Sequence, residues 1–256
     1  IGCIAKSQLS VTPGAGDDSA LVDMVREAAR ARGHLGAPRQ APSSPAPSVP
    51  ATNAAAARPE VIVIGASTGG VEALHTLLAS FPADCPPTLI VQHINGCFAG
   101  AIAQSFDRAV RPRVMLAESD MPLEPGTVLL APGNERHLQV AAAGARGLRC
   151  VLREGDPVSG HRPSVDRLFA SLASTLAATG GGARALGVLL TGMGQDGAQG
   201  MAQLASIGAR TIAQDQATCV VFGMPRAAID LGAAGEVLPL GRIGPSIFTP
   251  AKAALA

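Results

Sequence analysis

The sequence has no Trp and no Tyr, and aromatic residues make up 2% of its 256 positions. Proteins that hold single-stranded nucleic acid stack its bases on aromatic side chains, so a site of that kind is not expected. Charged residues are also scarce, at 15%, and the formal net charge is +1. Since nucleic-acid-binding domains usually carry a basic excess, we expect no nucleic-acid partner.

Long apolar runs and paired cysteines are missing as well. No stretch of 18 apolar residues occurs, so we expect no insertion into a membrane. The five cysteines are odd in number and none forms a C-x-x-C pair, which predicts neither a disulfide framework nor a zinc site. We therefore expect a reduced, cytoplasmic setting, no metal and no cofactor. The chain begins at Ile1 rather than at Met, without a signal peptide, which indicates a fragment.

The composition shifts along the chain and divides it into parts. Residues 1–36 contain one short apolar stretch and one helical pattern, too little to bury a core alone, so they are either the end of an incomplete domain or a poorly ordered tail. Residues 37–59 hold six prolines among Ala and Ser, which predicts a semi-rigid linker reaching roughly 70 Å. Residues 60–242 form the main domain, and residues 243–256 a C-terminal helix or tail.

The main domain alternates apolar runs with helical patterns. Continuous β-branched runs separated by helices are typical of a parallel sheet that is covered on both faces. We therefore predict a doubly wound α/β domain with a mostly parallel sheet and a small antiparallel hairpin insertion, formed by residues 137–140 and 148–152. The other expected strands are 61–64, 88–91, 114–117, 128–131, 185–190, 210–213 and 236–240, and the expected helices are 70–80, 98–110, 164–178 and 198–207.

Sites in open parallel sheets form beyond the carboxyl ends of the strands. That rule selects the turn from Gly65 to Gly70, which contains Ser67. Its glycines allow a sharp strand-to-helix reversal, and the helix N-terminus favours developing negative charge. The turn is not G-x-S-x-G, lacks a P-loop lysine and does not have the G-x-G-x-x-G spacing. Alone it is compatible with a nucleophile, a phosphate or nucleotide cradle, or a structural turn.

A histidine and an aspartate follow two other strands. His93 comes directly after residues 88–91 and could accept the proton of Ser67 as a general base, with His161 as the reserve candidate in a nearby loop. Asp196 lies in a glycine-rich loop after residues 185–190 and is either a helix N-cap or the carboxylate that orients His93. Competing carboxylates are Asp156, Asp166 and Asp215. Together the three residues suggest an acyl-transfer triad, whose convergence in space is an assumption at this point.

The residues also resemble a known family, the catalytic domain of bacterial chemotaxis protein-glutamate methylesterases (CheB-type). The resemblance runs over roughly residues 59–240. It is carried by Ile64-Gly65-Ala66-Ser67-Thr68-Gly69-Gly70, Gln92-His93, Ala131-Pro132-Gly133, His161-Arg162-Pro163-Ser164-Val165-Asp166, Leu190-Thr191-Gly192-Met193-Gly194-Gln195-Asp196-Gly197 and Val220-Val221-Phe222-Gly223-Met224-Pro225.

This resemblance implies a serine hydrolase that demethylates glutamate methyl esters in methyl-accepting chemoreceptors and deamidates glutamines there. It implies Ser67 as nucleophile, His93 as base, Asp196 as orienter, and Thr68 and Met193 as pocket residues near the oxyanion. A monomer is the default expectation. The alternatives are a serine esterase or amidase with another substrate, a phosphate- or nucleotide-binding module, and a receptor-binding scaffold without turnover.

Two departures from the family pattern matter. The segment Asn95-Gly96-Cys97-Phe98 stands where the family usually has Pro-Pro-Gly-Phe, which concerns receptor docking more than chemistry. Residues 1–36 resemble only the last strand and helix of a response-regulator receiver. The phospho-accepting pocket is therefore absent from this chain. Regulation by the histidine kinase of the pathway would need a full receiver.

Overall fold

The computed structural model describes residues 58–248, except 134–135, 145–146 and 179–180. The predicted receiver remnant and nearly all of the predicted linker lie outside the described residues. Everything described below belongs to the second of the two units into which the chain divides, residues 52–256.

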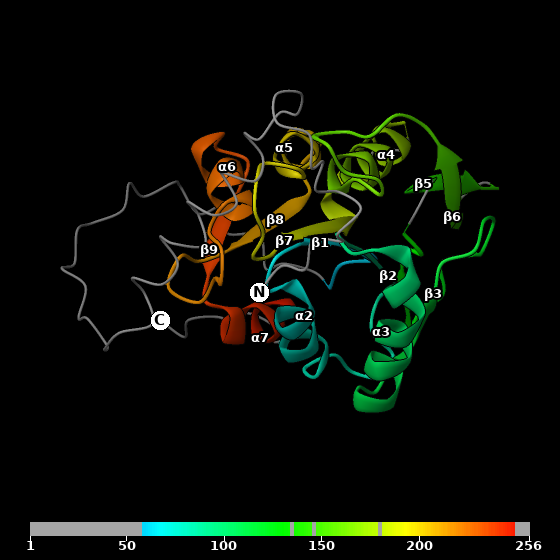
Figure 1. Cartoon of the computed structure of the whole chain (residues 1–256). Helices are drawn as coiled ribbons and strands as arrows, with labels where there is room; N and C mark the ends of the chain where they lie inside the picture. The colour runs from blue at the N-terminus through cyan, green and yellow to red at the C-terminus, as the bar shows by residue number, and fades with distance from the viewer. Residues whose placement is uncertain (1–57, 134–135, 145–146, 179–180, 249–256) are drawn as a thin grey trace, which may run out of the picture. The chain divides into compact units, whose positions relative to one another are not determined.

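A seven-stranded sheet, parallel throughout, forms the centre of this unit (Figure 1). Its strand order is β3-β4-β2-β1-β7-β8-β9, so β2, β3 and β4 lie on one side of β1 and the later strands β7, β8 and β9 lie on the other. The strands form because runs of Val, Ile and Leu can be buried on both faces at once. Their bounds are β1 Val61–Ala66, β2 Thr88–Gln92, β3 Arg113–Leu116, β4 Thr127–Leu130, β7 Ala185–Leu189, β8 Arg210–Gln214 and β9 Glu236–Leu238.

Helices cover both faces of the sheet, which confirms the predicted doubly wound architecture (Figure 1). One face carries the helices α4 Val165–Ala177, α5 Ala198–Ser206 and α6 Met224–Asp230, and the opposite face carries α2 Gly70–Leu78, α3 Gly96–Ala109 and α7 Leu240–Phe248. Each helical layer and the sheet enclose a separate apolar cluster. Burial of these two clusters fixes the sheet as the rigid frame from which the strand-end loops project.

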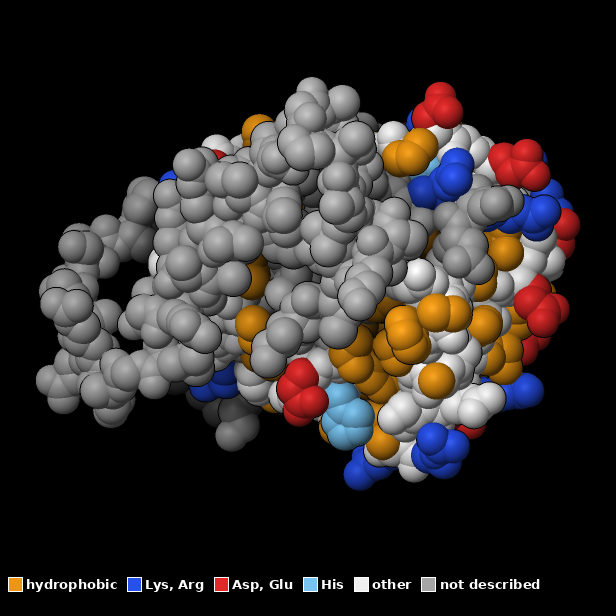
Figure 2. All heavy atoms as spheres, viewed as in Figure 1, with side chains coloured by type: hydrophobic (Ala, Val, Ile, Leu, Met, Phe, Trp, Pro, Cys, Tyr) orange, Lys and Arg blue, Asp and Glu red, His pale blue; other side chains and the backbone are white. Residues whose placement is uncertain are grey.

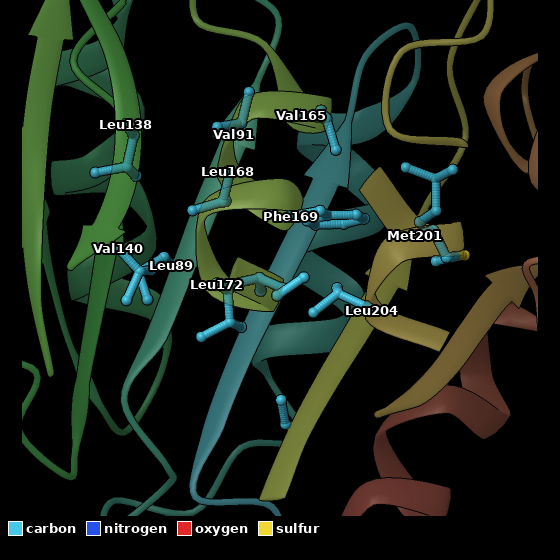
Figure 3. Close-up of a cluster of buried hydrophobic side chains, with 14 of the residues drawn as sticks. Leu89, Val91, Leu138, Val140, Val165, Leu168, Phe169, Leu172, Met201 and Leu204 are labelled. Atoms are coloured by element: carbon cyan, nitrogen blue, oxygen red, sulfur yellow. The ribbon is translucent and has the colours of Figure 1, made fainter. Parts of the chain in front are cut away.

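The predicted antiparallel insertion is the hairpin β5 Arg136–Ala143 and β6 Gly147–Glu154. It packs against α4 rather than joining the main sheet. Figure 3 shows Leu138 and Val140 of the hairpin beside Leu168 and Leu172 of α4, in a cluster that continues to α5. The hairpin therefore helps to hold the helix whose first turn lies at the strand ends.

The sequence patterns did not predict α6. They placed a C-terminal helix or tail at residues 243–256, whereas α7 begins at Leu240. Both helices are short: α6 has seven residues with Pro225 in its first turn, and α7 contains Pro245 and two glycines, which have poor helix propensity in a helix interior. Tertiary packing overrides propensity here, since Gly244 lies where a Cβ atom would overlap Ser80 of the segment after α2. In the described part of the chain, no helix has the length and apolarity needed to cross a membrane.

Candidate active site

Three neighbouring strands at the centre of the sheet carry the three predicted residues at their carboxyl ends. The strands β2, β1 and β7 lie side by side, with β1 in the middle. Ser67 follows β1 and His93 follows β2, directly after the register pair Ala66 and Gln92. Asp196 lies in the loop after β7. The switch in strand order around β1 thus brings three distant parts of the sequence to one rim.

Ser67 lies in a turn whose backbone is held by hydrogen bonds at Ser67 and Thr68, while the Ser67 hydroxyl has no hydrogen-bond partner among the described residues. Its backbone N–H donates to Thr191 O at 3.0 Å, and Thr191 Oγ1 donates to Thr68 O at 2.9 Å. Gly69 has a φ of 78° and precedes the first residue of α2, a conformation that favours glycine. Within the described residues, Ser67 Oγ makes no hydrogen bond, and the residue is partly exposed. The turn therefore presents an accessible hydroxyl at the start of a helix.

His93 and Asp196 are in direct contact. Nε2 of His93 lies 2.8 Å from Oδ2 of Asp196, and the side chains are 6% and 0% exposed. Since a carboxylate only accepts hydrogen bonds, Nε2 carries the proton and Nδ1 has the lone pair. Nδ1 is buried and has no hydrogen-bond partner among the described residues. This imidazole is thus oriented by a carboxylate and has one free basic nitrogen.

The first turn of α4 holds the Asp196 carboxylate. Oδ1 accepts hydrogen bonds from Ser164 Oγ at 2.8 Å and from the Asp166 N–H at 3.0 Å, and Oδ2 accepts one from the Val165 N–H at 2.7 Å. Burial alone would raise the pKa of Asp196, but the hydrogen bonds from His93, the Asp166 backbone and Ser164 outweigh it and lower that pKa. Asp196 is therefore ionised at neutral pH. It does not cap α5, whose N-cap is Gly197.

Gln92 links the nucleophile turn to the histidine. Its Nε2 donates to the backbone carbonyls of Ser67, at 2.8 Å, and of His93, at 3.2 Å. Gln92 is 3% exposed, and its Oε1 is buried without a partner in the described structure. One buried amide thus fixes the spacing of two neighbouring strand ends. The sequence pattern contains Gln92 in the Gln92-His93 motif but does not indicate this linking role.

His161, the reserve candidate for the general base, lies at the site but stacks on His93 instead of taking its place. Its ring stacks on the ring of His93, with centroids 3.8 Å apart and an angle of 9° between the planes. Burial, followed by the charge of His93, lowers the pKa of His161 to about 4. The ring is therefore neutral at pH 7. It covers one face of His93 instead of competing for the position of the base.

The predicted pocket residues Thr68 and Met193 flank the serine. Thr68 follows it directly, and Met193 follows Gly192, whose position next to the Ser67 backbone leaves no room for a side chain. The backbone N–H groups of Thr68 and Met193 donate no hydrogen bond within the described residues. These two N–H groups, without an acceptor in the described residues, are candidates for an oxyanion site next to Ser67.

The competing carboxylates lie elsewhere or serve other bonds. Asp156 is exposed, and Asp215 accepts from the N–H and hydroxyl of Thr218. Asp166 accepts from the Gly200 N–H at 2.7 Å, and its pKa is raised, first by burial and further by the nearby Asp196.

His137, which the sequence placed in the hairpin, is buried and accepts the Ser164 N–H through Nδ1. This hydrogen bond holds the N-cap residue of α4 in place.

Apolar side chains surround the strand-end rim. Val71 follows the Ser67 turn, Val220 packs over Gly69, and Phe98 lies in the first turn of α3; all three are more than a third exposed. Asn95 caps α3 by accepting the Cys97 N–H, so the departure from Pro-Pro-Gly-Phe leaves a regular helix start. Figure 2 shows, on the face it presents, hydrophobic side chains gathered between interspersed acidic and basic ones. These exposed apolar side chains leave apolar contact area near the Ser67 turn.

Known proteins are similar to this chain in sequence and in fold. A family model described as CheB methylesterase matches residues 62–247. A protein-glutamate methylesterase/protein-glutamine glutaminase of Gluconobacter oxydans is 53% identical over 73% of this chain and 52% of its own length. A protein of the same description from Anaeromyxobacter dehalogenans is 46% identical over 98% of this chain and 72% of its own length.

A solved structure of a protein with the same family description is similar to this chain in fold. The crystal structure of the Thermotoga maritima CheB methylesterase catalytic domain matches with a TM-score of 0.69 and 33% identity, over 74% of this chain and 97% of that one. The chain spans about half the length of several curated relatives that it matches, with 52% for Gluconobacter oxydans and 54% for Caulobacter vibrioides.

Proposed function

Because the chain belongs to the CheB methylesterase family, we propose that it hydrolyses the γ-methyl esters of glutamate residues in methyl-accepting chemoreceptors. The products are glutamate and methanol. We also propose that it deamidates glutamine at such positions, releasing ammonia, in keeping with the description of its relatives. The observation that carries the proposal is the Asp196-bound imidazole of His93, with a free Nδ1, on the strand next to Ser67.

In the first half of the proposed reaction, Ser67 Oγ attacks the ester carbonyl carbon while its proton moves to Nδ1 of His93. The carbonyl oxygen becomes an oxyanion, which the N–H groups of Thr68 and Met193 stabilise by ~3–4 kcal/mol per donor. Asp196, anchored on α4, stabilises the imidazolium. The intermediate collapses, the C–O bond to methoxide breaks, and His93 returns the proton so that methanol leaves. An ester between the glutamyl carbonyl and Ser67 remains.

Water completes the reaction. His93 Nδ1 takes a proton from the water molecule as its oxygen attacks the acyl carbon, and the second oxyanion uses the same two donors. The bond to Ser67 Oγ breaks, His93 returns the proton to that oxygen, and the free carboxyl group ionises. Each turnover thus converts a neutral side chain on the receptor into a negative one. Relative to the chymotrypsin-type triad, the two nitrogens of the histidine exchange roles.

A direct test measures methanol release from methylated receptor, with small esters assayed in parallel. Ser67→Ala is expected to lower the rate by at least 10³-fold and to abolish labelling by a fluorophosphonate. Its stability should change by less than about 0.5 kcal/mol, because the hydroxyl makes no hydrogen bond within the described residues. A near-normal rate in Ser67→Ala would reject the assignment. Turnover of small esters without methanol release from receptor would favour a related esterase with another substrate.

The wider context follows from the same proposal. The odd number of scattered cysteines favours a reduced compartment, so we place the enzyme in the cytoplasm, acting as a monomer. A complete receiver preceding this chain would accept phosphate from the histidine kinase of the pathway and regulate access to the Ser67 rim. Sedimentation of the full chain, with and without receptor fragments, tests the oligomeric state.

A further inference from the structure

The histidine pair at the site has a geometry that hydrolysis alone does not require. The His93 and His161 rings are nearly parallel, at 9°, with centroids 3.8 Å apart. His93 already has its orienting carboxylate in Asp196. His161 contacts neither the carboxylate nor the serine through any hydrogen bond in the described residues. What it supplies is a flat surface against one face of the base.

A surface of this kind matters because a single hydrogen bond at Nε2 holds the His93 ring incompletely. Rotation about the Cβ–Cγ bond moves Nδ1 farther than Nε2, since Nε2 lies closer to that axis. The bond to Asp196 therefore fixes one edge of the ring, while the catalytic edge could still swing. A ring stacked at van der Waals distance blocks that rotation on one side. Misplacement of a reacting group by about 1 Å can cost 10²-fold in rate.

We propose that His161 is a positioning residue, which holds the plane of the His93 ring so that the Ser67 hydroxyl can reach Nδ1. This inference rests on the proposed role of His93 as the base. It deepens that role by assigning a second support to the imidazole. One segment of the chain, residues 161–166, then supplies both supports: the stacking ring and the α4 donors that hold Asp196.

The loop that carries His161 is built to hold its ring in place. Val158 and His161 exchange two backbone hydrogen bonds, of 2.9 and 3.0 Å, around a tight turn in which Ser159 and Gly160 have positive φ. Three residues later Ser164 caps α4 by accepting the Arg167 N–H. These hydrogen bonds hold the backbone on both sides of His161. The position of its ring therefore need not change when His93 gains or loses a proton.

The charge state of His161 suits this role. The ionisable groups that act on it are His93 and Asp196. Because its pKa is lowered to about 4, His161 is neutral at pH 7 while His93 takes up and returns a proton in the proposed reaction. A neutral ring avoids the repulsion that a second cation, with ring centroids 3.8 Å apart, would exert on the protonated base.

The test compares His161→Ala and His161→Phe in the full chain, with His75→Ala as the matched control. Phe keeps a flat ring without ring nitrogens, and His75 is an exposed histidine on α2, away from the site. We expect His161→Ala to lower kcat by roughly 10- to 100-fold, with KM unchanged within about twofold. We expect His161→Phe to recover kcat to within about threefold of the wild type. We expect the kcat of His75→Ala to equal that of the wild type.

Two further measurements separate positioning from a general structural effect. In His161→Ala, water reaches the uncovered ring of the base and favours its protonated form, so the acid limb of the kcat/KM profile should move to higher pH. In His161→Phe that limb should overlay the wild type. By NMR, the ring protons of His93 should lose their ring-current shift in the Ala variant and keep it in the Phe variant.

The outcomes are distinct. Normal kcat and an unmoved acid limb in His161→Ala, with the ring-current shift lost, would overturn the inference. So would equal loss of activity in the Ala and Phe variants while both remain folded, because stacking would then be insufficient. A wild type that shows the ring-current shift but neither methanol release nor fluorophosphonate labelling would instead refute the proposed function and leave the stacking contact established.

Discussion

The backbone N–H of Val165 donates a 2.7 Å hydrogen bond to Oδ2 of Asp196, a residue 31 positions later in the chain. The same carboxylate accepts from the Ser164 hydroxyl and the Asp166 N–H, so three consecutive residues at the start of α4 bind it. The N-terminus of a helix carries partial positive charge and unpaired N–H groups. Asp196 can therefore stay ionised at 0% exposure and still orient His93.

Replacing Asp196 by Asn tests this anchoring. The amide nitrogen would place a donor among groups that donate to the carboxylate, so we expect a loss of about 2–4 kcal/mol in the free energy of unfolding. The imidazole would lose its orienting acceptor, which should lower kcat by roughly 10⁴-fold. Urea denaturation and methanol release measure the two effects. Asp156→Asn, at an exposed position, is the control; if it matched Asp196→Asn in both assays, the anchoring account would be wrong.

The two neighbouring aspartates should give opposite pH dependences of stability. Asp196 has a lowered pKa in the folded state, so its contribution is present above the unfolded value, near 3.8, and is lost as the pH falls through its folded pKa. Asp166 has a raised pKa, so its contribution is present at low pH and is lost as the pH rises through its folded pKa.

Asp166→Asn makes this difference measurable. The amide oxygen can still accept the Gly200 N–H, while the negative charge beside Asp196 is removed. We expect the variant to be at least as stable as the wild type at pH 7, with the difference shrinking toward pH 3. Thermal unfolding across pH 3–8 tests this. A variant less stable at pH 7 than at pH 4, relative to the wild type, would contradict the assigned directions.

Gln92→Leu removes the amide that links the two strand ends. The carbonyls of Ser67 and His93 would lose their side-chain donor, so we expect a stability loss of about 1–3 kcal/mol and a kcat reduced by roughly 10- to 100-fold. Thr211→Val is the matched control, since the Thr211 hydroxyl also forms two hydrogen bonds with the backbone away from the site, donating to Ala233 O and accepting from the Gly235 N–H. Similar stability loss without loss of kcat is expected there. Equal activity in both variants would argue against a positioning role for Gln92.

Gly192→Ala tests how closely the loop after β7 approaches the nucleophile. An added Cβ would lie 2.7 Å from Ser67 Cβ and would overlap Met224 Sδ. We expect a stability loss of about 1–3 kcal/mol from overpacking and a kcat lowered at least tenfold, because Ser67 must move. Gly100→Ala in α3 is the control: its nearest neighbour is 4.0 Å away, so it should stabilise the protein by about 0.5–1 kcal/mol. Unchanged kcat in Gly192→Ala would contradict the close packing.

Much of the fold could be predicted from local patterns. Runs such as Val61–Ile64 and Thr88–Val91 are apolar without alternation, which indicates strands buried on both faces, and the structure confirms them. Parallel strands place all their carboxyl ends on one edge, so Ser67, His93 and Asp196 could be expected at a common rim. By contrast, α6 was missed because seven residues that include a proline give almost no periodic signal.

The sequence by itself determined which residues could do chemistry and which edge of the sheet they share, because burial and strand direction are encoded in local composition. Only the tertiary structure decided that β2 and β7 flank β1, and hence that His93 meets Asp196. It also decided that α4 binds the carboxylate, that Gln92 links two strand ends, and that His161 covers the imidazole. These contacts join segments far apart in the chain, and their geometry follows from how whole layers pack, which no local pattern specifies.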